Sequence, residues 1–333
     1  MTWLNKTHTG DCRQLLKRMA DDGVVVQTCV TSPPYFGLRD YGHKDQIGLE
    51  RTPDEYVAGM VAVFRAVRGI LADSGTLWLN LGDCYATGAG GVGDCPGGGK
   101  QGESWKLRGK MTPPNRMPLP GLKPKDLIGI PWRVAFALQA DGWYLRSDIV
   151  WNKPNPMPES VTDRPTKAHE YLFLLAKSEI YHCDMAAIRE PSNMNGLSGA
   201  PRRISERERI SRDHKRGDKQ RGHGRRHNGF NDRWDKMTAE EQDALGRNKR
   251  SVWTVATEPY PGAHFATFPA KLIEPCVLAG AQPGETVLDP FMGSGTTAQV
   301  ATNLGRNYIG CELNPAYVKL QAEHRRTTIG MAL

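Results

Sequence analysis

Residues 286–297 read TVLDPFMGSGTT, and this motif gives the strongest indication of the fold. It begins with a short apolar run, 286–289, that predicts a strand, and it passes through a glycine turn into a predicted helix over 296–304. The run 308–311 predicts the next strand, and Glu312 follows it at once. Glycines let a ligand approach the backbone closely, and a carboxylate after the second strand can accept hydrogen bonds from ribose hydroxyls. The stretch therefore indicates a nucleotide-binding α/β sheet.

A second motif, TSPPY at residues 31–35, follows another apolar run, 24–30. That run predicts a buried parallel strand, so the motif stands at a carboxyl end, the edge at which open α/β sheets bind their ligands. The same alternation continues elsewhere, with helices predicted over 12–20, from Pro53, over 131–140 and from near 270, a turn at Ser74–Gly75, and strands over 76–81, 144–151 and 169–176. We therefore expect an α/β fold with a doubly wound, mostly parallel sheet.

The TSPPY motif suits chemistry on an exocyclic amino group. Such groups on adenine and cytosine are poor nucleophiles, because the nitrogen lone pair is delocalised into the ring. The Ser32 hydroxyl and the Pro33 carbonyl can accept the two amino N–H bonds, and Pro34 restricts their direction by fixing φ. If such a group belongs to a base in a duplex, it is out of reach, so the base would have to be flipped out. We expect Tyr35 to stack on the flipped base and Phe36 to extend that platform.

Together the two motifs resemble those of the S-adenosylmethionine-dependent DNA amino-methyltransferases, in which the glycine motif reads D-P-F-x-G-S-G-T-T. The resemblance implies S-adenosylmethionine as cofactor, with the glycine turn around its methionine part, Glu312 at the ribose and Asp11 near the adenine. A helix N-cap is an equal alternative for Asp11. The residues that the resemblance places at the cofactor are Asp11, Phe268, Pro269, Asp289, Pro290, Phe291, Gly293, Ser294, Gly295, Thr296, Thr297 and Glu312.

The order of the motifs also carries information. The catalytic motif precedes the cofactor motif, which resembles the β class of these enzymes, a circular permutation of the Rossmann-like fold. The sheet would then continue from Glu312 to the N-terminus, so the two chain ends are expected near each other. The expected parts are a catalytic half at 1–184 with a flexible loop at 85–125, a basic insertion for target recognition at 185–250, and a cofactor-binding half at 251–333.

The positive charge of the chain is unevenly distributed. The net charge is +8, and the segment from Ala200 to Lys236 holds 13 Lys and Arg against 6 Asp and Glu, or +7 of that total. Clustered cations bind phosphates, so double-stranded DNA is the expected partner, with a solvated loop as the alternative. The residues expected to contact DNA are Phe36, Lys153, Arg202, Arg203, Arg221, Arg225 and Arg226.

The identity of the target base depends on Ser32. Serine at this position resembles the enzymes that methylate cytosine at N4, whereas Asp is more common in adenine N6 enzymes, and both reactions need the same two acceptors. We therefore expect cytosine N4 methylation and keep adenine N6 open, with an RNA methyltransferase and a non-catalytic DNA-binding regulator as remote alternatives. Methylation at cytosine C5 needs a thiolate, but Cys276 lies inside a predicted helix and is expected to pack in the core.

Composition indicates the cellular location of the protein and the kinds of site it can contain. No apolar run is long enough to cross a bilayer, and the start of the chain lacks a secretory signal, so a cytoplasmic, nucleoid-associated protein is expected. Seven scattered cysteines without a C-x-x-C pair predict neither disulfides nor a metal site. A cognate restriction endonuclease is an open partner, and the chain is expected to be a monomer or a homodimer.

Overall fold

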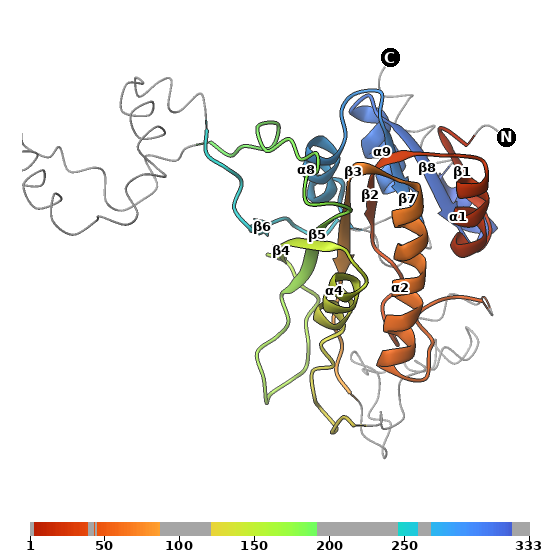
Figure 1. The fold of residues 1–333 in the computed structure, drawn as a ribbon. Coiled ribbons are helices and arrows are strands. Elements are labelled where there is room, and N and C mark those ends of the chain that lie inside the picture. The colour runs from red at the N-terminus through yellow and green to blue at the C-terminus, as the bar shows by residue number, and fades with distance from the viewer. Residues whose placement is uncertain are drawn as a thin grey trace, which may run out of the picture. The chain divides into compact units, whose positions relative to one another are not determined.

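A computed structural model of the chain describes residues 3–38, 43, 45–86, 121–191, 246–258 and 268–321. An eight-stranded sheet runs in the order β1-β8-β7-β2-β3-β5-β4-β6 (Figure 1). Its strands are β1 (Lys6–Thr9), β2 (Val26–Thr31), β3 (Leu71–Leu81), β4 (Tyr144–Asn152), β5 (His169–Ala176), β6 (Val252–Thr254), β7 (Thr286–Asp289) and β8 (Asn307–Glu312). The helices are α1 (Cys12–Asp21), α2 (Pro53–Ile70), α4 (Ile130–Ala140), α8 (Ala270–Gly280) and α9 (Thr296–Asn303).

Helices cover both faces of this sheet. Helix α2 packs between α1 and α4, while α8 packs against α9 and β2, and Figure 1 shows the two groups on opposite sides of the strands. Strands β1, β8, β7, β2 and β3 pair in parallel, and β5 runs antiparallel to both β3 and β4. The predicted doubly wound, mostly parallel sheet is confirmed. The carboxyl ends of β2, β3, β4, β7 and β8 all lie at one edge.

The first strand of the chain pairs with the last. Strand β1 lies parallel to β8, with Lys6 opposite Ile309 and Thr9 opposite Glu312. The backbone N–H of Asn5 donates to the carbonyl of Tyr308 at 2.7 Å. This pairing closes the sheet across the two ends of the sequence, as the permuted order of the motifs predicts.

The α2–β3 connection differs from the prediction. Helix α2 begins as predicted, with Pro53 in its first turn and the Thr52 side chain accepting from the backbone N–H of Glu55. The predicted turn at Ser74–Gly75 is wrong, because β3 starts directly after α2 and includes both residues. The register between β2 and β3 shifts in this region. A Cβ on Gly75 would stand 2.9 Å from the carbonyl oxygens of Ala72 and Gln27, so the close approach explains the glycine.

Contacts divide the chain into two compact units, one formed by 1–184 with 250–333 and the other by 185–249. In the second unit Glu190 and Arg247 pair through backbone hydrogen bonds in both directions and through an ion pair of 3.1 Å. The predicted DNA contacts Arg202, Arg203, Arg221, Arg225 and Arg226 lie outside the described residues, as does most of the loop predicted at 85–125. Among the described helices, none combines the length and apolar character needed to cross a membrane.

Candidate active site

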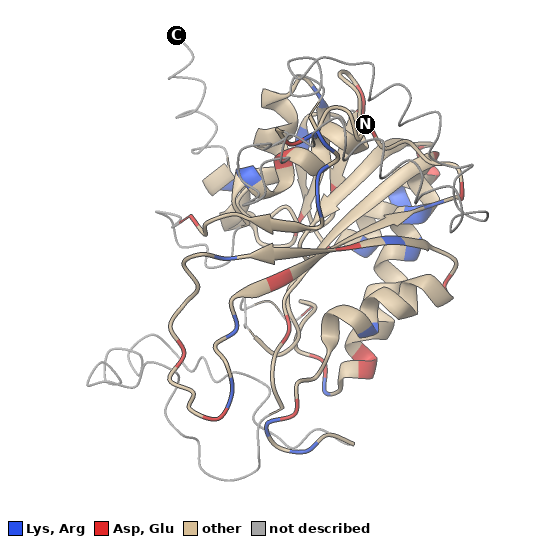
Figure 2. Ribbon diagram, turned by 90° about the vertical axis from the view of Figure 1, so that its left-hand side faces the viewer, with Lys and Arg blue, Asp and Glu red and all other residues tan. Residues whose placement is uncertain are grey.

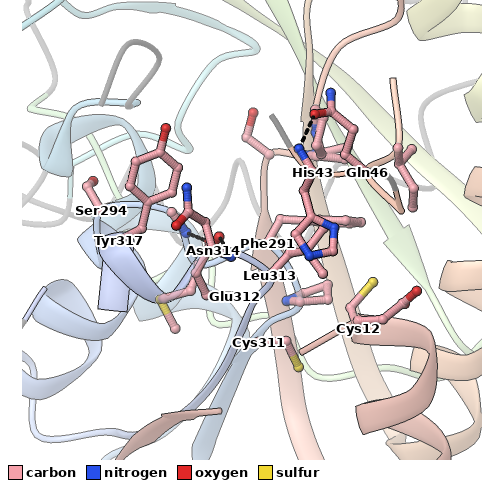
Figure 3. A pocket seen from close by; sticks show the side chains of 18 of the residues that line it. Cys12, His43, Gln46, Phe291, Ser294, Cys311, Glu312, Leu313, Asn314 and Tyr317 are labelled. Atoms are coloured by element: carbon pink, nitrogen blue, oxygen red, sulfur yellow. Dashed lines mark hydrogen bonds between the residues drawn. The ribbon is translucent and has the colours of Figure 1, made fainter. Parts of the chain in front are cut away.

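A pocket lies at the carboxyl edge of the sheet, where β1, β2, β7 and β8 end. Figure 3 shows that its walls come from opposite ends of the sequence, with Glu312, Asn314 and Tyr317 on one side and Cys12 and His43 on the other. The pairing of β1 with β8 brings these segments together, since the N–H of Gly10 donates to the carbonyl of Glu312 at 2.8 Å. The TSPPY motif and the glycine turn contribute Ser32, Pro33, Pro34, Tyr35, Pro290, Phe291, Met292, Gly293, Ser294 and Thr296 to the same pocket.

A buried tyrosine holds the backbone of the TSPPY motif through a hydrogen bond. The Tyr56 hydroxyl, on the fully buried side chain of that residue, donates to the Pro34 carbonyl at 2.8 Å. No hydrogen bond from the described residues reaches the Pro33 carbonyl. The Ser32 hydroxyl lies 3.4 Å from the Tyr35 hydroxyl. Ser32 and Pro33 thus present two acceptors next to the pocket.

The hydroxyl of Tyr35 belongs to a polar network. It lies 2.7 Å from Oε2 of Glu170 and 3.0 Å from Oδ1 of Asn80, and its single proton can be donated to one of them at a time. The other carboxylate oxygen of Glu170 pairs with the ammonium of Lys153. Burial and the charge of Glu170 raise the pKa of Tyr35 well above its usual value, so the phenol stays protonated. A Cβ at Gly82 would stand 2.5 Å from Cε2 of Tyr35, so glycine makes room for the ring.

The structure corrects the prediction for Phe36. Its side chain is fully buried, and its ring centroid lies 5.6 Å from that of Tyr56. Phe36 therefore packs in the core between β2 and α2 and offers no surface to a base or to DNA. Tyr35, by contrast, is only half-buried and lines the pocket.

Asp289 joins the two motifs rather than lining the pocket. One carboxylate oxygen accepts from the Thr31 hydroxyl at 2.6 Å and from the backbone N–H of Phe291 at 3.0 Å. The other accepts from the Thr297 hydroxyl at 2.7 Å. Burial raises the pKa of Asp289 to about 6, against the lowering effect of these hydrogen bonds. The carboxylate therefore fixes the end of β2 to the start of α9.

Four residues predicted to contact the cofactor lie outside the wall of the pocket. Neither Asp289 nor Thr297 lines it, because their side chains bond to each other. Gly295 has φ +87° and faces the side chain of Gln321, whose Nε2 donates to the Gly293 carbonyl at 2.8 Å. Pro269 is a buried residue that precedes α8. These four residues are absent from the pocket wall, so their contact with the cofactor stays a prediction, while the remaining predicted residues line the pocket.

Two carboxylates at the pocket have well-defined partners. Glu312 accepts from the backbone N–H groups of Gly293 and Asn314, both at 2.8 Å, and burial raises its pKa to about 7. Asp11 caps α1 by accepting from the N–H of Arg13, as the N-cap alternative predicts, and it also lines the pocket, so its contact with the cofactor stays a prediction. Burial raises the pKa of Asp11, but the bonds and charge of Arg13 outweigh it and leave that pKa below its usual value.

Part of the pocket wall was not predicted from the sequence. The segment 38–47 adds Leu38, His43, Asp45, Gln46 and Ile47, and the residues after Glu312 add Leu313, Asn314 and Tyr317. The N–H of His43 donates to Oε1 of Gln46 at 3.4 Å (Figure 3). Both segments directly follow motifs at the ligand-binding edge, and that adjacency is the signal that could have revealed them. No Lys or Arg lines the pocket among the described residues, so the site suits a cationic ligand with hydroxyl donors better than a phosphate.

Comparison with known proteins agrees with this geometry. A family model described as DNA methylase (N6_N4_Mtase) matches residues 26–323. The Type II methyltransferase M.XycI of Xanthomonas campestris pv. cyanopsidis is 44% identical over 319 residues, which cover 94% of this chain and 85% of that protein.

The solved PvuII DNA methyltransferase (cytosine-N4-specific) is 18% identical with a TM-score of 0.57, covering 96% of this chain and 88% of its own. The putative DNA modification methylase TTHA0409 of Thermus thermophilus, solved with S-adenosyl-L-methionine, is 20% identical with a TM-score of 0.52, covering 96% and 92%. The two structures share the fold, and the chain itself belongs to the N6/N4 family of DNA methylases.

Proposed function

We propose that the protein transfers a methyl group from S-adenosylmethionine to N4 of a flipped-out cytosine in double-stranded DNA. The observation that carries the proposal is the Asp289 carboxylate, which fixes the TSPPY motif and the glycine turn at one pocket through Thr31 and Thr297. Methyl transfer needs the donor and the amino group side by side, and this bond pattern holds their two binding elements together. Serine at position 32, where the adenine enzymes more often have Asp, supports cytosine over adenine.

The pocket fits the proposed methyl donor. S-adenosylmethionine carries a sulfonium, an ammonium and a carboxylate group, so that its net charge is positive, and it has ribose hydroxyls and no phosphate. The carboxylates of Asp11, Asp45 and Glu312 line the pocket and complement positive charge and hydroxyl donors. Apolar side chains of Phe268, Phe291, Ile47 and Leu313 supply surfaces for the flat adenine ring. When bound, the donor supplies an electrophilic methyl group.

The residues of the TSPPY motif would prepare the amino group for attack. Accepting its two N–H bonds at Ser32 Oγ and the Pro33 carbonyl localises the lone pair on nitrogen and directs it away from those acceptors. The Tyr35 ring, pinned through its hydroxyl, would hold the base plane by stacking. Because Tyr56 already occupies the Pro34 carbonyl, the acceptor role falls to Pro33.

The proposal extends to the biological setting. The related M.XycI bears the description Type II methyltransferase, which supports a role for this chain beside a restriction endonuclease of the same site specificity. The basic segment from 200 to 236 would supply contacts to DNA phosphates, because its charge is the main excess of the chain.

The test is transfer of a labelled methyl group from S-adenosylmethionine to mixed-sequence duplex DNA and, in parallel, to structured RNA. We expect incorporation into duplex DNA that saturates at a fixed number of sites per molecule. Incorporation into RNA without incorporation into any DNA would contradict the proposal. Heat-treated protein and an Asp289→Ala variant serve as controls for contaminating activity.

A further inference from the structure

We propose that the loop at residues 153–168, between β4 and β5, enters the DNA duplex at the target site, and that Met157 fills the space which the flipped base leaves. This inference rests on the proposed function, because it assumes that a base leaves the duplex. It assigns to one side chain the task of holding the duplex open while the base occupies the Tyr35 site.

The loop starts beside the catalytic motif. Strand β4 lies antiparallel to β5, as β3 does, so β4 ends at the same edge of the sheet as β2 and β3. Lys153, the first residue of the loop, pairs with Glu170, which lies 2.7 Å from the Tyr35 hydroxyl. Figure 1 and Figure 2 show the loop extending beyond the ends of the strands. The loop therefore starts next to the base that Tyr35 would hold.

The N-terminal half of the loop is restrained. It reads KPNPMPES over 153–160, and prolines at 154, 156 and 158 fix φ on both sides of Met157. Asn155 and Thr257 share three hydrogen bonds. Thr257 N–H donates to Asn155 Oδ1 at 2.9 Å, Asn155 Nδ2 donates to the Thr257 carbonyl at 3.1 Å, and the Thr257 hydroxyl donates to the Asn155 carbonyl at 3.4 Å. A restrained loop loses little conformational entropy when it enters a partner.

The C-terminal half is anchored on the other side. The guanidinium of Arg164 stacks 3.9 Å over the Tyr85 ring and donates to Glu159 at 2.7 Å. The ammonium of Lys167 donates to the Asp83 carbonyl at 3.0 Å. These contacts hold the C-terminal half of the loop against the segment after β3. Both halves of the loop are therefore restrained.

Charge on the loop does not oppose DNA. Its two acidic residues are Glu159 and Asp163, and each has a basic partner, Arg164 at 2.7 Å and Lys125 at 2.6 Å. The loop also holds three basic residues, which are Lys153, Arg164 and Lys167. A phosphate backbone approaching this edge therefore meets no uncompensated carboxylate from the loop.

Met157 is the apolar group at this position. Its side chain is 84% exposed, between two prolines and on a braced support. Proteins that open a base step insert such apolar side chains between the bases, and Met is among the residues used. An isolated exposed methionine needs no function, so the inference depends on the restrained loop that holds Met157 and starts beside the Tyr35 site.

The experiment compares Met157→Ala with Ile180→Ala on two duplexes that contain the site found by sequencing the modified DNA of a host expressing the protein. Ile180 is a matched control, because it is 86% exposed but follows β5 at the opposite edge of the sheet. In one duplex the target base is paired, and in the other it faces an abasic position, where extrusion costs less. The readout is kcat/KM for methyl transfer.

We expect Met157→Ala to lower kcat/KM on the paired duplex by about tenfold or more and to stay within about threefold of the wild type on the abasic duplex. Ile180→Ala should match the wild type on both. An equal loss on both duplexes, or no loss on the paired one, overturns the inference. Failure of the proposed function gives a different result, namely no transfer by the wild type to either duplex.

Discussion

The hydroxyl of Tyr35 lies 2.7 Å from Oε2 of Glu170, although 135 positions separate the two residues in the sequence. Strands β3 and β5 pair side by side, so the start of β5 returns to the edge where the TSPPY motif stands. Lys153 balances the charge of the Glu170 carboxylate. The ring that would stack on the target base is therefore fixed by a residue outside the motif.

Replacing Glu170 tests this positioning role. Glu170→Ala removes the acceptor of the Tyr35 hydroxyl and leaves Lys153 without its partner, so we expect kcat for methyl transfer to fall about tenfold. Cofactor affinity should change little, because Glu170 does not line the cofactor pocket. Single-turnover kinetics and calorimetric titration with S-adenosylmethionine provide the two measurements.

The matched control for Glu170 is Tyr35→Phe, which removes the same hydrogen bond from the other side and keeps the ring. If the two residues act through that bond, the double variant loses no more activity than the more damaging single one. Additive losses would show that Glu170 acts elsewhere.

The Asp289 carboxylate is predicted to matter for stability as well as activity. Asp289→Ala leaves the Thr31 and Thr297 hydroxyls and the Phe291 N–H buried without their acceptor, so the free energy of unfolding should fall by about 2–4 kcal/mol. Asp289→Asn retains one oxygen acceptor, and its NH2 group can donate to a threonine hydroxyl. The free energy of unfolding should therefore fall less than in Asp289→Ala. Denaturant titration ranks the three proteins, and equal stability of all three would refute the role.

Glu312 should make cofactor binding depend on pH. Burial raises its pKa to about 7, and hydroxyl donors of the ligand favour the ionised carboxylate. Affinity for S-adenosylmethionine should therefore rise as pH increases through about 7 and then level off, with proton release on binding below that pH. Titration calorimetry in buffers of different ionisation enthalpy measures this release, and Glu312→Gln should abolish it. Proton uptake by the wild type would contradict the assignment.

The raised pKa of Glu312 also makes the stability of the ligand-free protein depend on pH. The pKa of Glu312 is raised on folding from 4.5 to about 7, so its contribution to stability is fully present below 4.5 and is lost as pH rises to about 7. The Glu312→Gln variant should show a flatter dependence over this window, measured as the free energy of unfolding at each pH. An identical slope in the two proteins would assign the trend to other groups.

Local sequence was enough to predict the elements with strong apolar or capping patterns. Strand β5 and the strand before the glycine turn have their predicted bounds, and α2 starts at the predicted Pro53. These segments are long or have clear caps, so local signals agree with tertiary packing. The short strands β1 and β6 carry little apolar pattern, and their partners in the sheet define them.

The sequence predicted the residues of the site that belong to a motif. It did not predict the contacts between residues that lie far apart in the sequence. Residues of TSPPY and the glycine turn line one pocket as expected, whereas the orientation of Phe36 depends on packing against Tyr56. The approach of Glu170 to Tyr35 depends on strand order, which no local pattern encodes. Asp289 has the sequence position of a ligand contact, and only its threonine partners show that it joins the motifs.

The basic segment should provide sequence-independent DNA affinity. Deleting residues 200–236 removes +7 of charge, so DNA binding should weaken and its dependence on salt concentration should become shallower. Equilibrium binding at several salt concentrations gives the slope. An unchanged slope would show that the segment does not contact phosphates.

The most direct test of the central claim is the identity of the methylated nucleoside. Duplex DNA treated with the protein and S-adenosylmethionine is digested completely, and its nucleosides are separated and weighed by mass spectrometry. We expect N4-methylcytosine from the wild type and none when Ser32→Ala protein replaces it. N6-methyladenine as the sole product would contradict the assignment to cytosine, and the absence of any methylated nucleoside would contradict the proposed activity.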